Sequence, residues 1–164
     1  MDKQTLQIHY FLFSNEKELM EQDRILLNKA QEASIKAYAP YSNFRVGAAV
    51  LLDNGEIVIG NNQENAAYPQ GMCAERVALF SAMAQYPDMK IISIAVYGNP
   101  QHFQMENYLA PCGGCRQVML EYELKHKHKI RVLLGGNSGK VMLIEGIENL
   151  LPFQFSVKDI RLDS

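Results

Sequence analysis

Three cysteines, placed in two short runs that each open a predicted helix, constrain the fold of this chain of 164 residues more than any other feature. One run is Cys73-Ala74-Glu75-Arg76, and the other is Pro111-Cys112-Gly113-Gly114-Cys115-Arg116. The first turn of a helix carries unpaired N–H groups and a partial positive charge, which lower the pKa of a thiol and favour the thiolate. If the three thiolates bind one metal ion, the N-termini of both helices have to meet at one point of the fold.

The number of cysteines indicates the kind of metal site. A structural zinc site has four protein ligands, whereas a catalytic one has three and leaves the fourth position to water. Glu75, two residues after Cys73, is close enough to reach a water molecule on the metal without being a ligand, and a carboxylate there can accept and return protons. We therefore interpret Cys73, Cys112 and Cys115 as ligands of one zinc ion per subunit, with Glu75 as its general base.

Other interpretations of the same residues stay open. A Cys-x-x-Cys pair alone also occurs in redox dithiols and in structural zinc sites. A closed structural site needs a fourth ligand, for which His102, ten residues before Cys112, is the candidate. Glu75 on its own would suit the start of a helix without any catalytic role. Arg76 and Arg116 are candidates to donate hydrogen bonds to sulfur and offset the charge of three thiolates, or else to form surface ion pairs.

The composition is that of an ordinary single-domain globular protein, with 48% apolar and 21% charged residues. A formal net charge of −2 gives no electrostatic reason to expect nucleic acid or a membrane as a partner. The basic run at 125–129 is interpreted as the solvated end of a helix. Because the N-terminus does not resemble a signal peptide, no apolar stretch has membrane-spanning length, and the number of cysteines is odd, we expect a cytoplasmic protein.

The spacing of apolar residues predicts helices that alternate with strands. Three helices are expected, over residues 16–38, 73–86 and 112–126. Strands are expected over residues 5–13, 44–52, 56–62, 90–97, 130–134 and 141–144. Ser14 is the expected N-cap of the first helix, and Asp53-Asn54-Gly55 is expected to join two strands as a hairpin turn. This order favours an α/β fold, a three-layer α/β/α sandwich with a central mixed sheet of about five strands.

Several segments together carry a resemblance to a known family. Cys73-Ala74-Glu75 followed by Pro111-Cys112-Gly113-Gly114-Cys115 resembles the signature of the zinc deaminases, in which a glutamate that does not bind the metal moves protons. With the segments 38–49, 62–68, 112–118 and 150–152, the chain resembles the homotetrameric zinc-dependent cytidine deaminases over roughly residues 25–160. Gln63 and Asn61 depart from the family pattern, which usually has an aliphatic residue and often a cysteine at those positions. Residues 1–20 are interpreted as an N-terminal extension packed on a deaminase domain of residues 21–164.

The resemblance implies roles for individual residues. Cys73, Cys112 and Cys115 match the zinc ligands, Glu75 matches the catalytic proton carrier, and Arg76 stays the candidate that supports the sulfur ligands. The substrate-binding residues that it implies are Phe44 beside the nucleoside, Asn62 and Glu64 at the ribose hydroxyls, Ala74 at the base, and Phe155 from a neighbouring subunit. Phe153 is a second candidate for that last role. The resemblance also implies a homotetramer with active sites near the subunit interfaces.

The expected activity is the hydrolytic deamination of cytidine and 2′-deoxycytidine to uridine and 2′-deoxyuridine with release of ammonia, a reaction of pyrimidine salvage. One alternative is an activity like that of blasticidin S deaminase on a related nucleoside, against which Phe44, Asn62 and Glu64 favour cytidine. Another is a zinc-stabilised binding module without turnover. Editing of a base within a polynucleotide is disfavoured because no basic surface is indicated.

Overall fold

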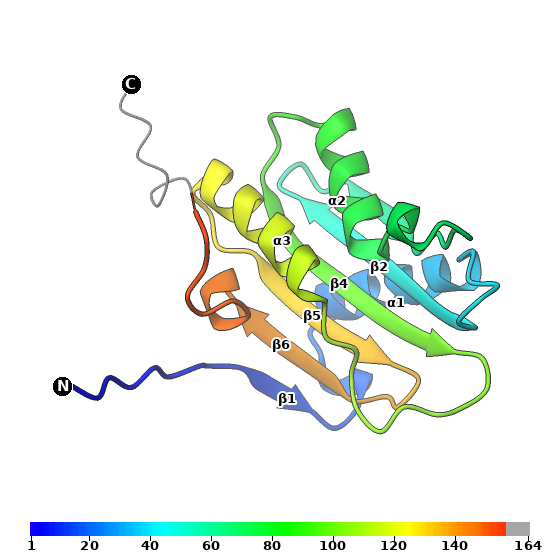
Figure 1. Cartoon of the computed structure of the whole chain (residues 1–164), viewed down its shortest axis with the longest axis horizontal. Coiled ribbons are helices and arrows are strands. Elements are labelled where there is room, and N and C mark those ends of the chain that lie inside the picture. Colours follow the sequence, from blue (N-terminus) through cyan, green and yellow to red (C-terminus); the bar gives the residue numbers. More distant parts are fainter. Residues whose placement is uncertain (157–164) are drawn as a thin grey trace.

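The computed structural model describes residues 1–156, in which one mixed β-sheet is covered by helices on both faces (Figure 1). The sheet has six strands in the order β1-β6-β5-β4-β2-β3. The strands are β1 Phe11–Phe13, β2 Phe44–Leu52, β3 Ile57–Asn61, β4 Ile91–Pro100, β5 Arg131–Gly136 and β6 Val141–Glu145. The helices are α1 Glu21–Ile35, α2 Ala74–Gln85 and α3 Gly113–His126. β4 and β5 run parallel, and all other neighbours in the sheet are antiparallel.

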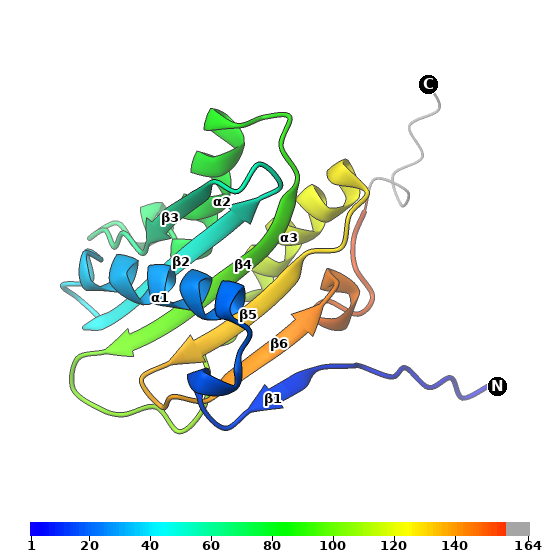
Figure 2. The same ribbon diagram turned by 180° about the vertical axis from the view of Figure 1, so that it is seen from behind.

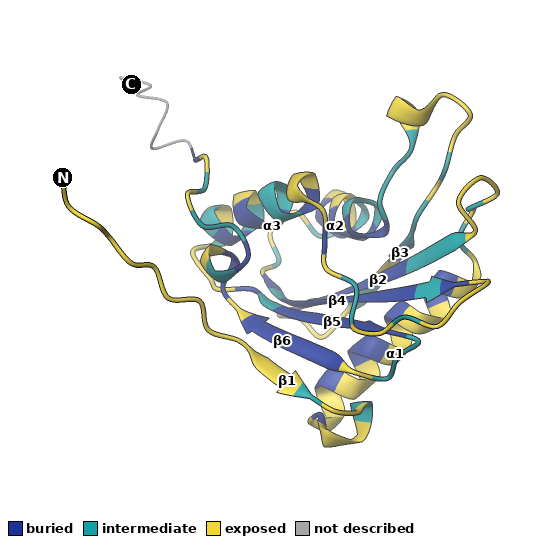
Figure 3. Ribbon diagram, turned by 60° about the horizontal axis from the view of Figure 1, so that its bottom comes forward, coloured by how far each residue is buried: buried dark blue, intermediate teal, exposed yellow. Residues whose placement is uncertain are grey.

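The helices form two layers, with α2 and α3 on one face of the sheet and α1 on the other (Figures 1 and 2). Successive residues of a strand point to opposite faces. In β2, Ala48 and Val50 accordingly pack in the core shared with α2 and α3, whereas Ala49 and Leu51 pack in the core shared with α1. Figure 3 shows the buried central strands between these two layers. The predicted three-layer α/β/α sandwich is confirmed, with six strands rather than about five.

The hairpin of β2 and β3 forms one edge of the sheet, with β3 as the edge strand. β2 has the predicted bounds, because its apolar run is buried between two neighbouring strands and ends at the predicted turn. In that turn Gly55 has a φ of +88°, a conformation that favours glycine. Because β2 pairs antiparallel with β3, the beginning of β2 at Phe44 and the end of β3 at Asn61 lie at the same end of the sheet.

The first 20 residues differ from the predicted elements. The expected strand over 5–13 shortens to β1, which pairs with β6 at the edge of the sheet. Ser14 is not the N-cap of α1, which begins at Glu21 after the N-cap residue Met20. A separate 3-10 turn, Glu16–Glu18, precedes it and is capped by Asn15, whose side chain accepts a hydrogen bond from the Lys17 N–H at 3.0 Å. Acidic residues suit the start of either element, so the sequence pattern predicted one helix where the structure has a 3-10 turn followed by α1.

None of the helices within residues 1–156 is long and apolar enough to span a membrane.

An ion pair links the α1 layer to the sheet. Arg131 in β5 donates to both carboxylate oxygens of Asp23 in α1, at 3.0 and 2.8 Å, and the Asp23 side chain is only 3% exposed. Replacing Arg131 by methionine keeps an unbranched apolar side chain but leaves a buried carboxylate without its guanidinium partner. We expect the free energy of unfolding to fall by about 3 kcal/mol in urea titrations. The control is Lys29→Met, which breaks an exposed pair with Glu32 and should cost less than about 0.5 kcal/mol. Equal losses in the two variants would contradict the prediction.

Candidate active site

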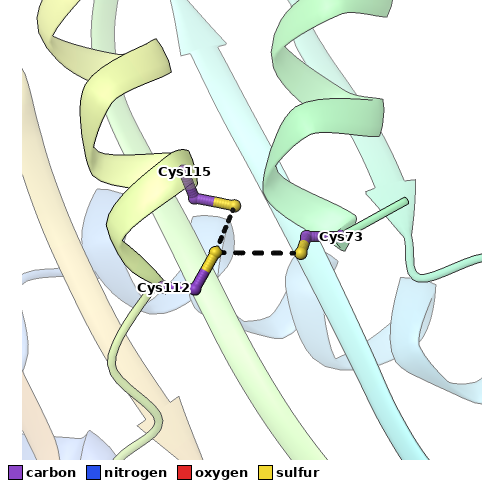
Figure 4. A group of neighbouring side chains, drawn as sticks. All are labelled: Cys73, Cys112 and Cys115. Carbon is purple, nitrogen blue, oxygen red and sulfur yellow. Dashed lines mark hydrogen bonds between the residues drawn. The ribbon is translucent and has the colours of Figure 1, made fainter. Parts of the chain in front are cut away.

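The N-termini of α2 and α3 lie next to each other and bring the three cysteines together (Figure 4). Cys73 is the N-cap of α2, Cys112 is the N-cap of α3, and Cys115 lies in the first turn of α3. The sulfur of Cys112 is 4.0 Å from that of Cys73 and 3.5 Å from that of Cys115. All three sulfur atoms lie within 4.8 Å of one another. Two helices that are far apart in the sequence thus supply one group of metal-binding side chains.

The separations between the sulfur atoms fit a zinc ion. Thiolates that bind tetrahedral zinc at about 2.3 Å lie roughly 3.8 Å apart, and the Cys112 sulfur lies 3.5 and 4.0 Å from the other two. His102 is exposed and is not part of the group, which within residues 1–156 consists of the three cysteines. The alternative of a closed site with His102 as fourth ligand is therefore not supported, and three thiolates leave one position for water.

The surroundings of Cys73 favour its thiolate. A hydrogen bond with Cys115 and another from the Arg76 guanidinium, with Nη2 at 3.7 Å from the sulfur, lower the pKa of Cys73 to about 5 despite partial burial. The same hydrogen bond with Cys73, together with burial, raises the pKa of Cys115. One thiolate is thus stabilised by the protein itself, and a metal ion would replace the proton at its neighbour.

The Arg116 guanidinium binds backbone carbonyls rather than a cysteine sulfur. Its Nε donates to the carbonyl of Pro111 at 2.9 Å, and its Nη1 donates to the carbonyl of Leu150 at 2.7 Å. The guanidinium therefore ties the residue before Cys112 to the C-terminal part of the chain. The sequence could not distinguish this role, because both arginines follow closely after a cysteine.

Glu75 is the one carboxylate in the first turn of α2, and it is buried, with 5% of its surface exposed. Burial raises the pKa of the Glu75 carboxyl, and the nearby Cys73 thiolate acts in the same direction. A carboxylate in such surroundings holds and releases a proton closer to neutral pH than an exposed one does.

A cavity of about 400 Å³ opens beside these residues and is lined by both Glu75 and Cys73. Four of the five substrate-binding residues predicted from the sequence line it: Phe44, Asn62, Glu64 and Ala74. Phe155 lies outside it, with an exposed ring and a carbonyl that accepts a hydrogen bond from Gln117 Nε2 at 2.9 Å. Its predicted contact with a neighbouring subunit stays a prediction.

Asn62 and Glu64 line the cavity while also holding the backbone around it. The Asn62 side chain accepts from the Val46 N–H at 2.8 Å and donates to the Phe44 carbonyl at 3.0 Å. Glu64 accepts from the N–H groups of Tyr41 and Ser42 at 2.9 and 3.2 Å, and from the Ser42 hydroxyl. An amide and a carboxylate each have further hydrogen-bonding capacity, which remains for a ligand.

Several residues of the cavity wall were missed by the sequence analysis. Ser42 comes just before the matched Phe44, and its role follows only from its contact with Glu64. Leu109 and Ala110 come from an irregular segment without periodicity, so no sequence signal placed them at the cavity.

Comparisons with known proteins agree with this geometry. The family model of the cytidine and deoxycytidylate deaminase zinc-binding region matches residues 20–128. A protein named cytidine deaminase from Halalkalibacterium halodurans is 37% identical over 138 residues, which cover 84% of this chain and 97% of the relative. The crystal structure of cytidine deaminase from Burkholderia pseudomallei has a TM-score of 0.70 and 40% identity, covering 84% of this chain and 100% of that one. For cytidine deaminase from Mycobacterium tuberculosis the TM-score is 0.64 at 29% identity, over 84% of this chain and 98% of that one. The chain therefore belongs to the cytidine and deoxycytidylate deaminase family, whose model describes a zinc-binding region.

Proposed function

We propose that this protein deaminates cytidine and 2′-deoxycytidine to uridine and 2′-deoxyuridine and releases ammonia. The observation that carries the proposal is the buried carboxylate of Glu75 in the wall of a cavity that also contains Cys73, one of three thiols grouped within 4.8 Å. The named relatives described above support cytidine as the substrate.

Each residue of the site has a definite task in this reaction. Cys73, Cys112 and Cys115 would hold a zinc ion, which supplies an acidified water molecule as the nucleophile. Glu75 takes up a proton from the attacking water and delivers it to N3 of the cytosine ring, so that C4 becomes more electrophilic. After the new C–O bond has formed, Glu75 accepts the remaining proton of the C4 hydroxyl and transfers it to the amine at C4, so that the oxygen becomes the C4 carbonyl. The C–N bond then breaks, and the amine leaves as ammonia.

The cavity wall supplies groups that suit a nucleoside. Phe44 offers an apolar face, while Asn62 and Glu64 offer hydrogen-bonding groups in the same cavity wall. A volume of about 400 Å³ is within the usual range for small-molecule sites. We infer that Asn62 and Glu64 bind the ribose hydroxyls and that Ala74, at the start of α2, contacts the base.

The decisive experiment measures ammonia release and the change in ultraviolet absorbance when the purified protein is mixed with cytidine, with and without a zinc chelator. Blasticidin S is assayed beside cytidine. Turnover of cytidine that stops on chelation is the expected result. Turnover of blasticidin S alone would contradict the substrate, and zinc binding without ammonia release from either compound would indicate a binding module.

Replacing Glu64 by glutamine tests the ribose contact. The charge-assisted hydrogen bond to a hydroxyl is lost, so we expect KM for cytidine to rise about tenfold while kcat changes little. Glu32→Gln is the matched control, because it makes the same change at an exposed carboxylate of α1 that pairs with Lys29 outside the cavity, and it should leave KM unchanged. Steady-state kinetics of both variants check the prediction, and an unchanged KM in Glu64→Gln would contradict it.

We further propose a homotetramer in which Phe155 reaches the site of a neighbouring subunit. Three exposed aromatic residues, a type enriched in protein interfaces, support this: Tyr68 is 76% exposed, Phe153 97% and Phe155 59%. The family match begins at residue 20, which supports the interpretation of residues 1–20 as an extension to the deaminase domain.

A cytoplasmic location is proposed because three unpaired thiols suit a reducing compartment.

A further inference from the structure

Residues 101–110, which connect β4 to α3, place an exposed aromatic ring against the wall of the cavity. Phe103 is 59% exposed, and its ring centroid lies 6.1 Å from that of Phe44 at an interplanar angle of 45°. Phe44 itself lines the cavity, as do Leu109 and Ala110 at the other end of the same loop. The loop thus supplies part of the cavity wall, and its Phe103 ring also packs against Phe44 in another part of that wall.

Both ends and the middle of this loop are fixed to the sheet. The Gln101 N–H donates to the Asn43 carbonyl at 3.1 Å, and the Leu109 N–H donates to the Gly135 carbonyl at the same distance. Between them Met105 lies over two paired glycines, Gly98 and Gly136. A Cβ atom at either glycine would lie less than 3 Å from the Met105 sulfur, at 2.8 and 2.9 Å, so the absence of side chains lets the loop approach the sheet.

Asn137, directly after β5, holds the backbone on which Phe103 is mounted. Its Nδ2 donates to the Phe103 carbonyl at 3.0 Å, and its Oδ1 accepts from the Met105 N–H at 2.8 Å. These two contacts lie on either side of Gln104, so a single side-chain amide fixes the loop next to the exposed ring. Such an arrangement fixes the backbone that carries the Phe103 ring, although the residue is 59% exposed.

We propose that Phe103 is a positioning residue for nucleoside binding: the loop clamped by Asn137 holds its ring against Phe44 and so fixes the orientation of the Phe44 ring in the cavity. The inference rests on the proposed function. Aromatic pairs prefer tilted or offset geometries like this one, and the contact limits how far Phe44 can turn. In the proposed function Phe44 contacts the nucleoside and not the reacting atoms. If its ring loses this orientation, the binding of the substrate and the binding of the transition state weaken equally. KM then rises, and kcat stays the same.

Steady-state kinetics with cytidine test the inference. We expect Phe103→Ala to raise KM about three- to tenfold with kcat within twofold of the wild type, and Phe103→Leu to restore part of the affinity. Asn137→Ala, which frees the loop, should change KM in the same direction. Phe11→Ala removes another exposed phenylalanine, at the edge strand β1, and should leave KM unchanged.

A double-mutant cycle separates positioning from an independent contact. If Phe103 acts through Phe44, then Phe44→Ala and the double variant Phe44→Ala/Phe103→Ala have the same KM. Additive increases would overturn the inference, as would a wild-type KM in Phe103→Ala. A change in the molar mass of Phe103→Ala, measured by light scattering, would also overturn it, because the ring would then serve a subunit contact. Absence of cytidine turnover in the wild type would instead contradict the proposed function.

Discussion

The variant Glu75→Gln is expected to lose a factor of about 10³ or more in kcat for cytidine while keeping one zinc ion per chain. Glutamine has nearly the shape of glutamate, so it fits the same buried position. It cannot take up and return a proton, and general acid–base catalysis by a positioned group is typically worth 10²–10⁴. Because the proposed reaction needs two proton transfers by the same carboxylate, the loss should lie toward the upper end of that range.

The matched control is Glu123→Gln, which changes a second buried glutamate, in α3. Glu123 accepts hydrogen bonds from the N–H groups of Ile130 and Ile147 and does not line the cavity. We expect this variant to unfold at a lower temperature but to retain its kcat. Zinc content is measured in both variants by atomic absorption. A kcat for Glu75→Gln within tenfold of the wild type would exclude Glu75 as the proton carrier.

The second large effect is expected from the loss of a thiol. Cys73→Ala removes one of three metal ligands, and two remaining thiols on one helix cannot complete a stable zinc site. We expect the purified variant to contain little zinc and to show no measurable turnover of cytidine. Its melting temperature should also fall, because a metal ion bound only by the folded state stabilises that state.

Gly113→Ala serves as the control for a small side-chain change next to the three thiols that removes none of them. Gly113 lies between Cys112 and Cys115, and a Cβ atom there would meet no atom within 4 Å. The variant keeps all three thiols, so its zinc content should equal that of the wild type. Full zinc occupancy in Cys73→Ala would show that Cys73 is not a ligand.

Patterns with a strong local cause were predicted well from the sequence. The bounds of β2 followed from an apolar run that ends at Asp53-Asn54-Gly55, and α2 and α3 begin directly after the predicted Cys73 and Cys112. In each case a turn or a helix start is encoded within a few residues. The helix predicted over residues 16–38 is present as α1, but its predicted start included the separate 3-10 turn, because acidic residues suit the start of both elements.

Contacts between distant segments were beyond the reach of local patterns. The sequence could propose Asn62 and Glu64 as ligand-binding residues, but not that Asn62 pairs with the backbone of β2 or that Glu64 holds the turn at Tyr41. Likewise, the fixed position of Phe103 depends on Asn137, which is 34 residues away and lies beyond α3 and β5. These contacts follow from the order of strands in the sheet, which periodicity alone does not determine.

Because the three thiols come from the N-termini of two separate helices, they become available to a metal ion at different stages of chain synthesis. Cys73 leaves the ribosome long before Cys112, from which it is separated by 39 positions. The helix that begins directly after Cys112 and contains Cys115 is also the crossover between the parallel strands β4 and β5, and non-local pairings of this kind slow folding. A nascent chain that has emerged only as far as β4 therefore offers a single thiol to a metal ion, and the full set of three requires synthesis to have passed residue 115.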